Sequence, residues 1–235
     1  MSEQNNTIYY LQHKDILNKE ILINEIYNNL NTNYYFTDSF EEDFYIDLCY
    51  LGFISTSLQD NENLYLLPEI QFEYAVLYFK NLHISKKVKK LINKDNYNFK
   101  INSNIDELFN ALDSYHNPNW LCGEYKELIK KLSKNDKKNF KVNTFLVQDK
   151  CTKENIAGEI GYTIGDTYTS LTGFSSSKKE YRNYGKLQLV LTAKYLEEHQ
   201  YKLWNLGHPY MDYKFELGAI KYTRKEFLEK WFSSI

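Results

Sequence analysis

The chain has 235 residues, of which 43% are hydrophobic and 26% are charged, and its formal net charge is -2. This composition is typical of a soluble globular protein and excludes a global basic field, so any contact with nucleic acid must come from a local cluster of lysines. No apolar run approaches the roughly 20 residues that cross a bilayer, the N-terminus has no signal-peptide pattern, and the three cysteines form no CxxC pair. We therefore expect a cytoplasmic protein without a membrane segment, a disulfide framework or a metal site.

The first third of the chain predicts two helices followed by strands. Apolar residues at helical spacing predict an amphipathic helix over 15–30. Ser39 and Glu42 have the spacing of a capping box and predict the start of a second helix. The aromatic and aliphatic segment 63–79 predicts extended strands. We expect these elements to form a small N-terminal α/β domain over 1–73.

Three further helices are predicted in the middle of the chain. Ser85 has the position of an N-cap before a helix that is apolar on one face and lysine-rich on the others. Asn104 followed by Glu107 predicts a second capped helix, and a short third helix covers about 123–133. The lysines of the first helix that we select as candidate contacts to nucleic acid are Lys86, Lys87, Lys89 and Lys90.

The last part of the chain predicts three strands, a helix, a strand and a final helix. Short polar turns join the three strands, which indicates an antiparallel meander. Thr223 and Glu226 cap the final helix. This order predicts an α+β fold with a GNAT-like, that is acetyltransferase-like, domain over 74–235. The expected strands cover 140–149, 154–165 and 167–174, and the helix and strand after them cover 186–199 and 201–207.

An acetyl-CoA enzyme of this fold requires a glycine-rich turn at the start of the long helix, of the form Gln/Arg-x-x-Gly-x-Gly/Ala. The corresponding stretch is RNYGKL, in which Arg182 and Gly185 fit but Leu187 occupies the last position, where a small residue is needed. The sequence therefore predicts no organic cofactor, and a CoA-dependent N-acetyltransferase is kept only as an alternative.

Five segments occur in a characteristic order: NLHISKKVKKL, Trp120, AGEIGYTIGDTYTSLTGF, KLWNLG and ELGAIKYTRKEFLEKW. Together they resemble the leucyl/phenylalanyl-tRNA-protein transferase family from about Leu82 to Trp231. The resemblance implies a domain that uses aminoacyl-tRNA instead of CoA and moves the amino acid to the α-amino group of a protein N-terminus, an N-degron step. The partners implied are a charged tRNA and a protein or peptide N-terminus. A non-catalytic tRNA-binding adaptor is the rival interpretation.

The resemblance also assigns roles to individual residues. Trp120 matches a family tryptophan near the terminal adenosine of the tRNA, where stacking explains its role. Tyr168 falls where the family has a phenylalanine at the pocket, and the four selected lysines match the basic helix that contacts tRNA. The residues on the helix that lines the family's pocket correspond to Leu189, Thr192 and Leu196.

Three polar residues of the family are absent. Its glutamate on the hairpin strand corresponds to Leu171, its aspartate on the later strand to Asn205, and its nearby glutamine to Gly207. The usual polar relay is therefore missing. We expect Asn205 to orient the incoming amine, and Asp212 or Tyr168 to assist proton movement.

Glu159 lies where the leucine- and phenylalanine-transferring enzymes have an apolar residue against the bound side chain, and Gly173 corresponds to the neighbouring apolar position of those enzymes. A buried, unpaired carboxylate is costly, and a guanidinium is its natural bidentate partner. We therefore predict a preference for a cationic amino acid, arginine above all. In the alternative, the strand is shifted and Glu159 contacts solvent or a lysine of its own chain. Arg182 and Lys186 are candidate contacts for an acidic group of the acceptor.

Overall fold

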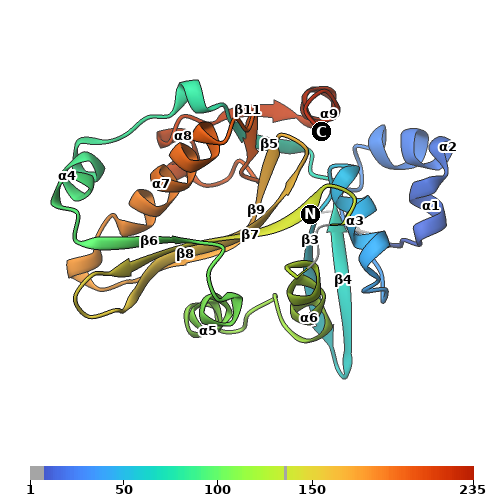
Figure 1. Ribbon diagram of the computed structural model, residues 1–235. Helices are drawn as coiled ribbons and strands as arrows, with labels where there is room; N and C mark the ends of the chain where they lie inside the picture. The colour runs from blue at the N-terminus through green and yellow to red at the C-terminus, as the bar shows by residue number, and fades with distance from the viewer. Residues whose placement is uncertain (1–7, 135–136) are drawn as a thin grey trace, which may run out of the picture.

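The computed structural model describes residues 8–134 and 137–235. A seven-stranded mixed sheet forms its centre (Figure 1). The strands of this sheet are β5 (Glu73–Leu77), β6 (Tyr97–Ile101), β7 (Phe140–Asp149), β8 (Asn155–Ile164), β9 (Thr167–Ser175), β10 (Leu203–Asn205) and β11 (Ile220–Thr223). Their order is β11-β5-β10-β9-β8-β7-β6. Strands β7, β8 and β9 pair antiparallel in succession, which confirms the predicted meander, whereas β10 runs parallel to β9 and antiparallel to β5.

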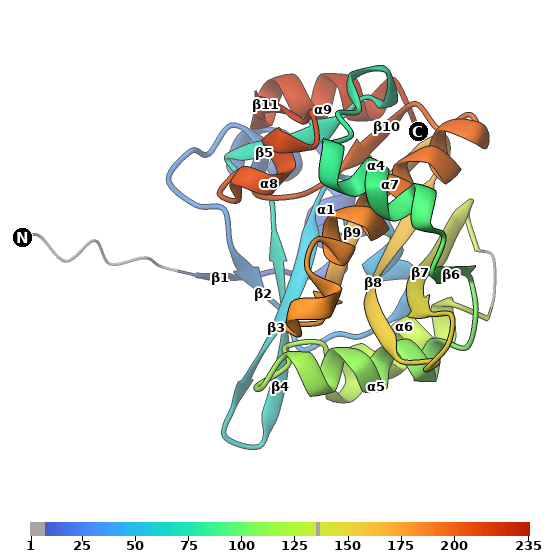
Figure 2. The same ribbon diagram turned by 90° about the vertical axis from the view of Figure 1, so that its left-hand side faces the viewer.

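Helices cover both faces of the sheet. Helix α7 (Tyr184–Glu198) packs on one face with α4 (Lys86–Lys94) beside it, while α5 (Ile105–Tyr115) and α6 (Gly123–Leu132) pack on the other (Figures 1 and 2). Strand β7 shows why both faces are buried. Its Phe145 belongs to the hydrophobic cluster under α7, and its neighbour Leu146 belongs to the cluster that contains α5 and α6, as expected when alternate side chains point to opposite faces.

The N-terminal part differs in detail from its prediction. The helix expected over 15–30 consists of α1 (His13–Leu17), α2 (Lys19–Ile21) and a π-helical turn (Leu22–Tyr27). The break lies at Asn18, whose extended backbone ends α1 and whose side chain accepts hydrogen bonds from the first amides of α2. This competing use of an asparagine side chain interrupts a helix that the apolar spacing alone predicts to be continuous.

The capping box predicted at Ser39 and Glu42 is wrong. Helix α3 (Glu42–Tyr50) has Glu41 as its N-cap, and the Ser39 hydroxyl accepts a hydrogen bond from the Glu41 amide in the turn before the helix. Before α3, β1 (Tyr9–Tyr10) pairs with β2 (Tyr35–Phe36); after it, β3 (Ile54–Asp60) and β4 (Asn63–Glu69) form a separate hairpin.

Other predicted caps are confirmed. Ser85 accepts a hydrogen bond from the amide of Val88 at the start of α4, and Asn104 accepts one from Asp106 at the start of α5. Thr223 and Glu226 form a reciprocal capping box at α9 (Arg224–Phe232). The short helix α8 (Asp212–Glu216), β6, β11 and the 3-10 turns Phe79–Asn81 and Lys179–Tyr181 were not predicted.

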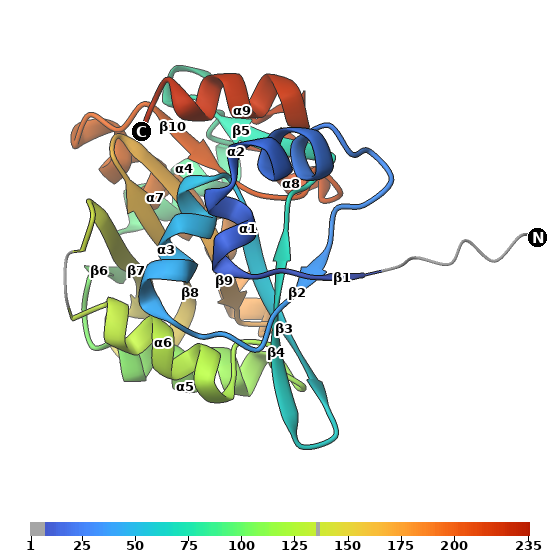
Figure 3. The ribbon, with the colours of Figure 1, turned by 90° about the vertical axis from the view of Figure 1, so that its right-hand side faces the viewer.

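Helices α1 to α3 and helix α9 lie on one side of the molecule (Figure 3). One hydrophobic cluster extends from Leu11 near the start of the described chain to Trp231 in α9, so the N-terminal elements share a core with the large sheet. The division into domains 1–73 and 74–235 stays a prediction. Across residues 8–134 and 137–235, no helix is long and apolar enough to cross a membrane.

Candidate functional site

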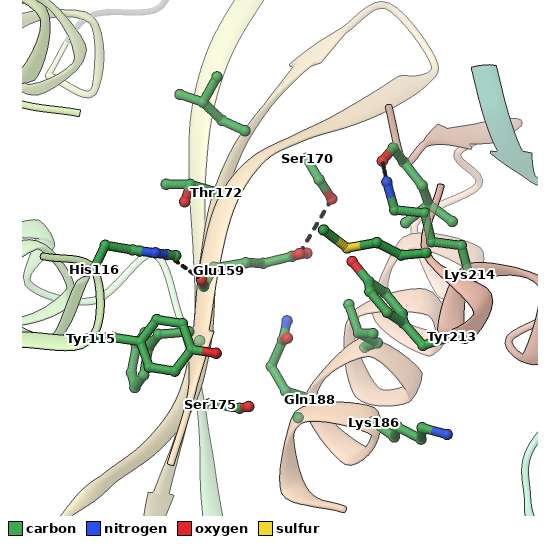
Figure 4. A pocket seen from close by; sticks show the side chains of 18 of the residues that line it. Tyr115, His116, Glu159, Ser170, Thr172, Ser175, Lys186, Gln188, Tyr213 and Lys214 are labelled. Atoms are coloured by element: carbon green, nitrogen blue, oxygen red, sulfur yellow. Dashed lines mark hydrogen bonds between the residues drawn. The ribbon is translucent and has the colours of Figure 1, made fainter. Parts of the chain in front are cut away.

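A cavity of about 530 Å³ opens where β9 separates from β10 (Figure 4). The two strands pair only over Thr167–Thr169 and Leu203–Asn205. A bulge at Leu171 then bends β9 away from β10. Among the described residues, the second half of β9 therefore has no paired strand on the side of β10. We call this cavity the β9 pocket. It is lined by Gly158 and Glu159 of β8, residues 170–175 of β9, Gly185, Lys186, Gln188 and Leu189 of α7, and Tyr115, His116, Trp120, Leu206, Met211, Tyr213 and Lys214.

Two glycines make room for the polar end of the pocket. Gly173 pairs directly with Glu159, and a Cβ atom at position 173 would lie 3.1 Å from the Cβ of Glu159. At Gly161, a Cβ atom would lie 2.4 Å from the Tyr168 hydroxyl. The absence of a side chain at position 161 therefore allows the Tyr168 ring to reach Glu159 across the sheet face.

Glu159 is buried, with 4% of its surface exposed, and its carboxylate is held by hydroxyl groups. Tyr168 donates to Oε1 at 3.2 Å, and Ser170 donates to Oε2 at 3.2 Å. The Trp204 indole donates to the Ser170 oxygen at 2.8 Å, which leaves the serine proton for Glu159. Within the described chain, no lysine, arginine or histidine forms an ion pair with this carboxylate. The alternative in which Glu159 contacts solvent or a lysine does not agree with this geometry.

Burial raises the pKa of Glu159 to about 7, although hydrogen bonds from Tyr168, Ser170 and Gln188 act in the opposite direction. Burial favours the neutral acid because the charged form loses its hydration. The carboxyl group therefore loses its proton at a higher pH than an exposed glutamate does, and a cationic ligand in the pocket would favour its charged form.

Gln188 and Tyr213 complete this polar end and were not predicted. Both side chains point toward Glu159 (Figure 4). The Gln188 amide also donates to Thr192 Oγ1 at 3.0 Å, one helical turn further along α7. Burial and the neighbouring Glu159 raise the pKa of Tyr213 to about 12, so its phenol stays protonated and can donate. The spacing of four residues between Gln188 and Thr192 could have placed Gln188 on the same face of the helix as the predicted Thr192. No sequence pattern indicated Tyr213.

Lys214, on α8, was also not predicted. Its side chain is buried, and its ammonium group donates to the backbone oxygens of Leu206 at 2.5 Å and His208 at 2.6 Å. Burial lowers the pKa of Lys214 to about 8. No carboxylate lies within ion-pair distance of it among residues 8–134 and 137–235. The pocket thus contains one buried acid and one buried base that are not paired with each other.

The structure does not bring the three predicted catalytic residues together at the pocket wall. Tyr168 is fully buried behind Glu159. Asn205 is buried too, and its side-chain oxygen accepts a hydrogen bond from the Gly207 amide at 3.0 Å. Because side chains alternate along β10, Asn205 faces away from Trp204 and from Ser170. Asp212 is exposed at the start of α8 and does not line the pocket.

The predicted substrate-binding residues are partly assembled. Trp120, Gly173 and Leu189 line the β9 pocket together with Glu159. Thr192 lies below it as the acceptor for Gln188, and Leu196 is fully buried in the hydrophobic cluster under α7. Leu187, the position that a CoA-binding turn would need to keep small, is fully buried in the same cluster.

The four predicted tRNA-binding lysines form an exposed strip on α4. Lys86, Lys87, Lys89 and Lys90 are all exposed, while Val88 between them is buried against the rest of the protein. No ion pair involves these lysines in the part of the chain that the structure describes. Arg182 is exposed as well, whereas Lys186 lines the pocket and is paired with Glu216.

Comparisons with known proteins agree with this architecture. Residues 76–231 match the family described as leucyl/phenylalanyl-tRNA protein transferase. Among solved structures, the chain is similar to FemX with 11% identity and a TM-score of 0.51, over 91% of this chain and 76% of that one. L-PGS from Bacillus licheniformis has 11% identity and a TM-score of 0.49, over 80% of this chain and 64% of that one. No protein with a curated description matches the sequence.

The fold prediction is confirmed: the chain is α+β, with an acetyltransferase-like arrangement like that of FemX. The matched family is described by transfer between tRNA and protein. The match covers more than half of the chain, and the protein therefore belongs to the leucyl/phenylalanyl-tRNA protein transferase family.

Proposed function

We propose that this protein transfers a cationic amino acid, arginine above all, from charged tRNA to the α-amino group of a protein N-terminus in the cytoplasm, as an N-degron step. The observation that carries the choice of amino acid is the buried Glu159 carboxylate, which lines the β9 pocket without a cationic partner in the described chain. An unpaired buried charge is costly, and a ligand cation would compensate for it.

The pocket has the chemistry that an arginine side chain requires. An ionised carboxylate offers about four acceptor positions, of which Tyr168 and Ser170 occupy two and Gln188, which also donates to Thr192, approaches a third. A guanidinium can donate two parallel hydrogen bonds to the two carboxylate oxygens when the Gln188 amide keeps its bond to Thr192. Leu189 and Met211 on the pocket wall supply apolar surface for the methylene groups of the side chain. The volume of about 530 Å³ is sufficient for such a group.

The reaction needs few acid–base groups because the aminoacyl ester is already activated. The acceptor amine attacks the ester carbonyl, the carbon–oxygen bond to the ribose breaks, and the amine proton ends on the ribose oxygen. Positioning of the two reactants supplies much of the rate enhancement in such a step. In this proposal Tyr168 is a positioning residue that acts through Glu159, and Asn205 and Asp212 have no direct part.

The test measures transfer of arginine, leucine and phenylalanine from charged tRNA to peptides with different N-terminal residues. We expect the wild type to prefer arginine, and Glu159→Gln and Glu159→Met to lower kcat/KM for arginine about ten- to a hundredfold while leucine transfer changes little. Glu154→Gln is a matched control, since Glu154 is paired with Lys178 outside the pocket.

A wild type that prefers leucine or phenylalanine to arginine, or arginine transfer that is unaffected by the Glu159 variants, would contradict the selection of a cation. No transfer of any amino acid under single-turnover conditions, with tRNA binding intact, would favour the non-catalytic adaptor. A rise in melting temperature on addition of CoA would favour the acetyltransferase.

The lysines of α4 are proposed to contact tRNA phosphates, and this is tested by salt dependence. Replacing Lys86, Lys87, Lys89 and Lys90 by alanine should weaken binding of charged and uncharged tRNA alike and reduce the slope of log K against log salt by up to about 3. The control replaces four lysines that are paired with carboxylates, namely Lys130, Lys131, Lys137 and Lys138. Equal slopes for the wild type and the α4 variant would contradict the assignment.

A further inference from the structure

We propose that Lys214 is the anion-binding end of the β9 pocket and that it binds the side-chain carboxylate of an acceptor whose first residue is aspartate or glutamate. The inference rests on the proposed transfer reaction and adds to it the class of acceptor. It starts from the observation that Lys214 lines the same pocket as Glu159 but comes from a different wall.

The hydrogen bonds of Lys214 leave room for a ligand. An ammonium group has three donors, and the backbone oxygens of Leu206 and His208 accept two of them. These two bonds fix the nitrogen of a residue that lines the pocket. The charge itself is uncompensated, because no carboxylate of the described residues lies within ion-pair distance. A ligand carboxylate can accept the third hydrogen bond and neutralise the charge.

The balance of charge in the pocket favours an acidic acceptor. When the cationic donor side chain is bound, it neutralises Glu159. Lys186, the other lysine of the wall, is already paired with Glu216. Lys214 then remains as the uncompensated charge. A basic acceptor residue would add a second positive charge beside Lys214 in a site of low polarity, whereas an acidic acceptor residue would neutralise the charge of Lys214.

The geometry of the product agrees with this assignment. Transfer makes the donor amino acid and the acceptor residue adjacent in one chain. In an extended peptide, adjacent side chains point to opposite sides. Glu159 extends into the pocket from β8, and Lys214 lines it from α8 across the cavity, with its ammonium group directed at the Leu206 oxygen (Figure 4). The two charged residues can therefore bind the two neighbouring side chains of the product, one each.

A tRNA phosphate is the other anion that this lysine can meet, and the surroundings argue against it. Lys214 is only 6% exposed, in contrast to the exposed lysines of α4. A phosphodiester remains part of a long, hydrated backbone, whereas a side-chain carboxylate is small and can enter the cavity. The experiment includes tRNA binding in order to distinguish the two sources.

The first measurement is binding of product peptides, which requires no turnover. Peptides that begin Arg-Asp, Arg-Asn, Leu-Asp and Leu-Asn are titrated into the wild type, Lys214→Met and Glu159→Gln by calorimetry. We expect the wild type to bind Arg-Asp at least tenfold more tightly than Arg-Asn, and Lys214→Met to abolish this ratio while it keeps the preference for arginine over leucine. Lys221→Met is the matched control and should keep both preferences, since Lys221 is paired with Glu73 outside the pocket.

The second measurement is transfer to Asp-, Asn-, Glu- and Gln-initiated peptides, with the same ratios expected in kcat/KM. A lysine that only holds residues 206–208 in place would lower binding of aspartate and asparagine peptides equally, and that result would overturn the inference. Weaker binding of charged tRNA by Lys214→Met, with the peptide ratios unchanged, would assign the lysine to a phosphate instead. A lost arginine preference with a retained aspartate preference would refute only the proposed donor.

Discussion

Replacing Arg224 by methionine is expected to lower the free energy of unfolding by about 4 kcal/mol, since several buried backbone oxygens would lose their hydrogen-bond donor and each unsatisfied polar group is costly. The side chain is 2% exposed, and its guanidinium lies 4.9 Å from the centre of the Phe72 ring. Its five N–H groups lie within hydrogen-bond distance of six backbone oxygens, so that Nη1 shares its two protons among three of them. The six oxygens belong to Ile26, Tyr27, Asn29, Thr32, Ile70 and Gln71.

The position of Arg224 explains the size of the effect. It is the first residue of α9 and binds the carbonyl groups at the end of the N-terminal helical segment and after β4. The chain has only two arginines among 29 basic residues, and one of them occupies this site. A lysine has three donors and no planar fork, so it cannot serve six acceptors that lie in different directions.

Urea unfolding of Arg224→Met, Arg224→Lys and Arg182→Met tests this role. The lysine variant should lose less than the methionine variant because it keeps the charge and some hydrogen bonds, and the exposed Arg182 should matter little. We also expect the transition of Arg224→Met to broaden, because the N-terminal segment would separate before the sheet. Equal stability of Arg224→Met and the wild type would show that the backbone oxygens form hydrogen bonds with water in place of Arg224, without a loss of free energy.

Local sequence signals predicted the elements that depend on local interactions. Ser85 and the pair Thr223–Glu226 cap their helices as expected because a cap needs only neighbouring residues. The meander was recognisable because its strands are apolar on alternating positions and joined by short turns. The edge strands β6 and β11 were missed because they carry half-exposed or exposed residues, and their pairing with β7 and β5 determines them.

The site was predictable only in part for the same reason. Glu159 stood out as a charged residue within an apolar strand, and the strand register places it in the cavity. Asn205 was assigned to catalysis from its place in the order of motifs, but the pairing of β10 turns it toward the opposite face. Lys214 is held at the pocket because the segment after β10 brings the backbone oxygens of Leu206 and His208 to α8, an arrangement that no spacing in the sequence encodes.

Glu159→Gln is expected to become more stable than the wild type as the pH rises, by about 3 kcal/mol between pH 4.5 and 7.5. The pKa of Glu159 is raised from 4.5 to about 7 in the folded protein. Below pH 4.5 the group is protonated in both the folded and the unfolded protein. Between pH 4.5 and 7 the unfolded chain releases the proton and the folded chain retains it, so the wild type loses stability by about 1.4 kcal/mol per pH unit.

Chemical denaturation of both proteins across this range measures the difference, with Glu197→Gln, on the exposed side of α7, as the control for loss of a surface charge. Parallel stability curves for Glu159→Gln and the wild type would show that the carboxylate ionises in the pocket without penalty.

The free-energy cost of ionising Glu159 in the folded protein also connects stability with selectivity. A cationic ligand that pairs with Glu159 removes the penalty of its ionised form, so near pH 8 an arginine-initiated peptide should stabilise the wild type and leave Glu159→Gln almost unchanged. Glu159→Gln, which is more stable than the wild type at high pH, must therefore also be the variant that no longer binds the cationic ligand.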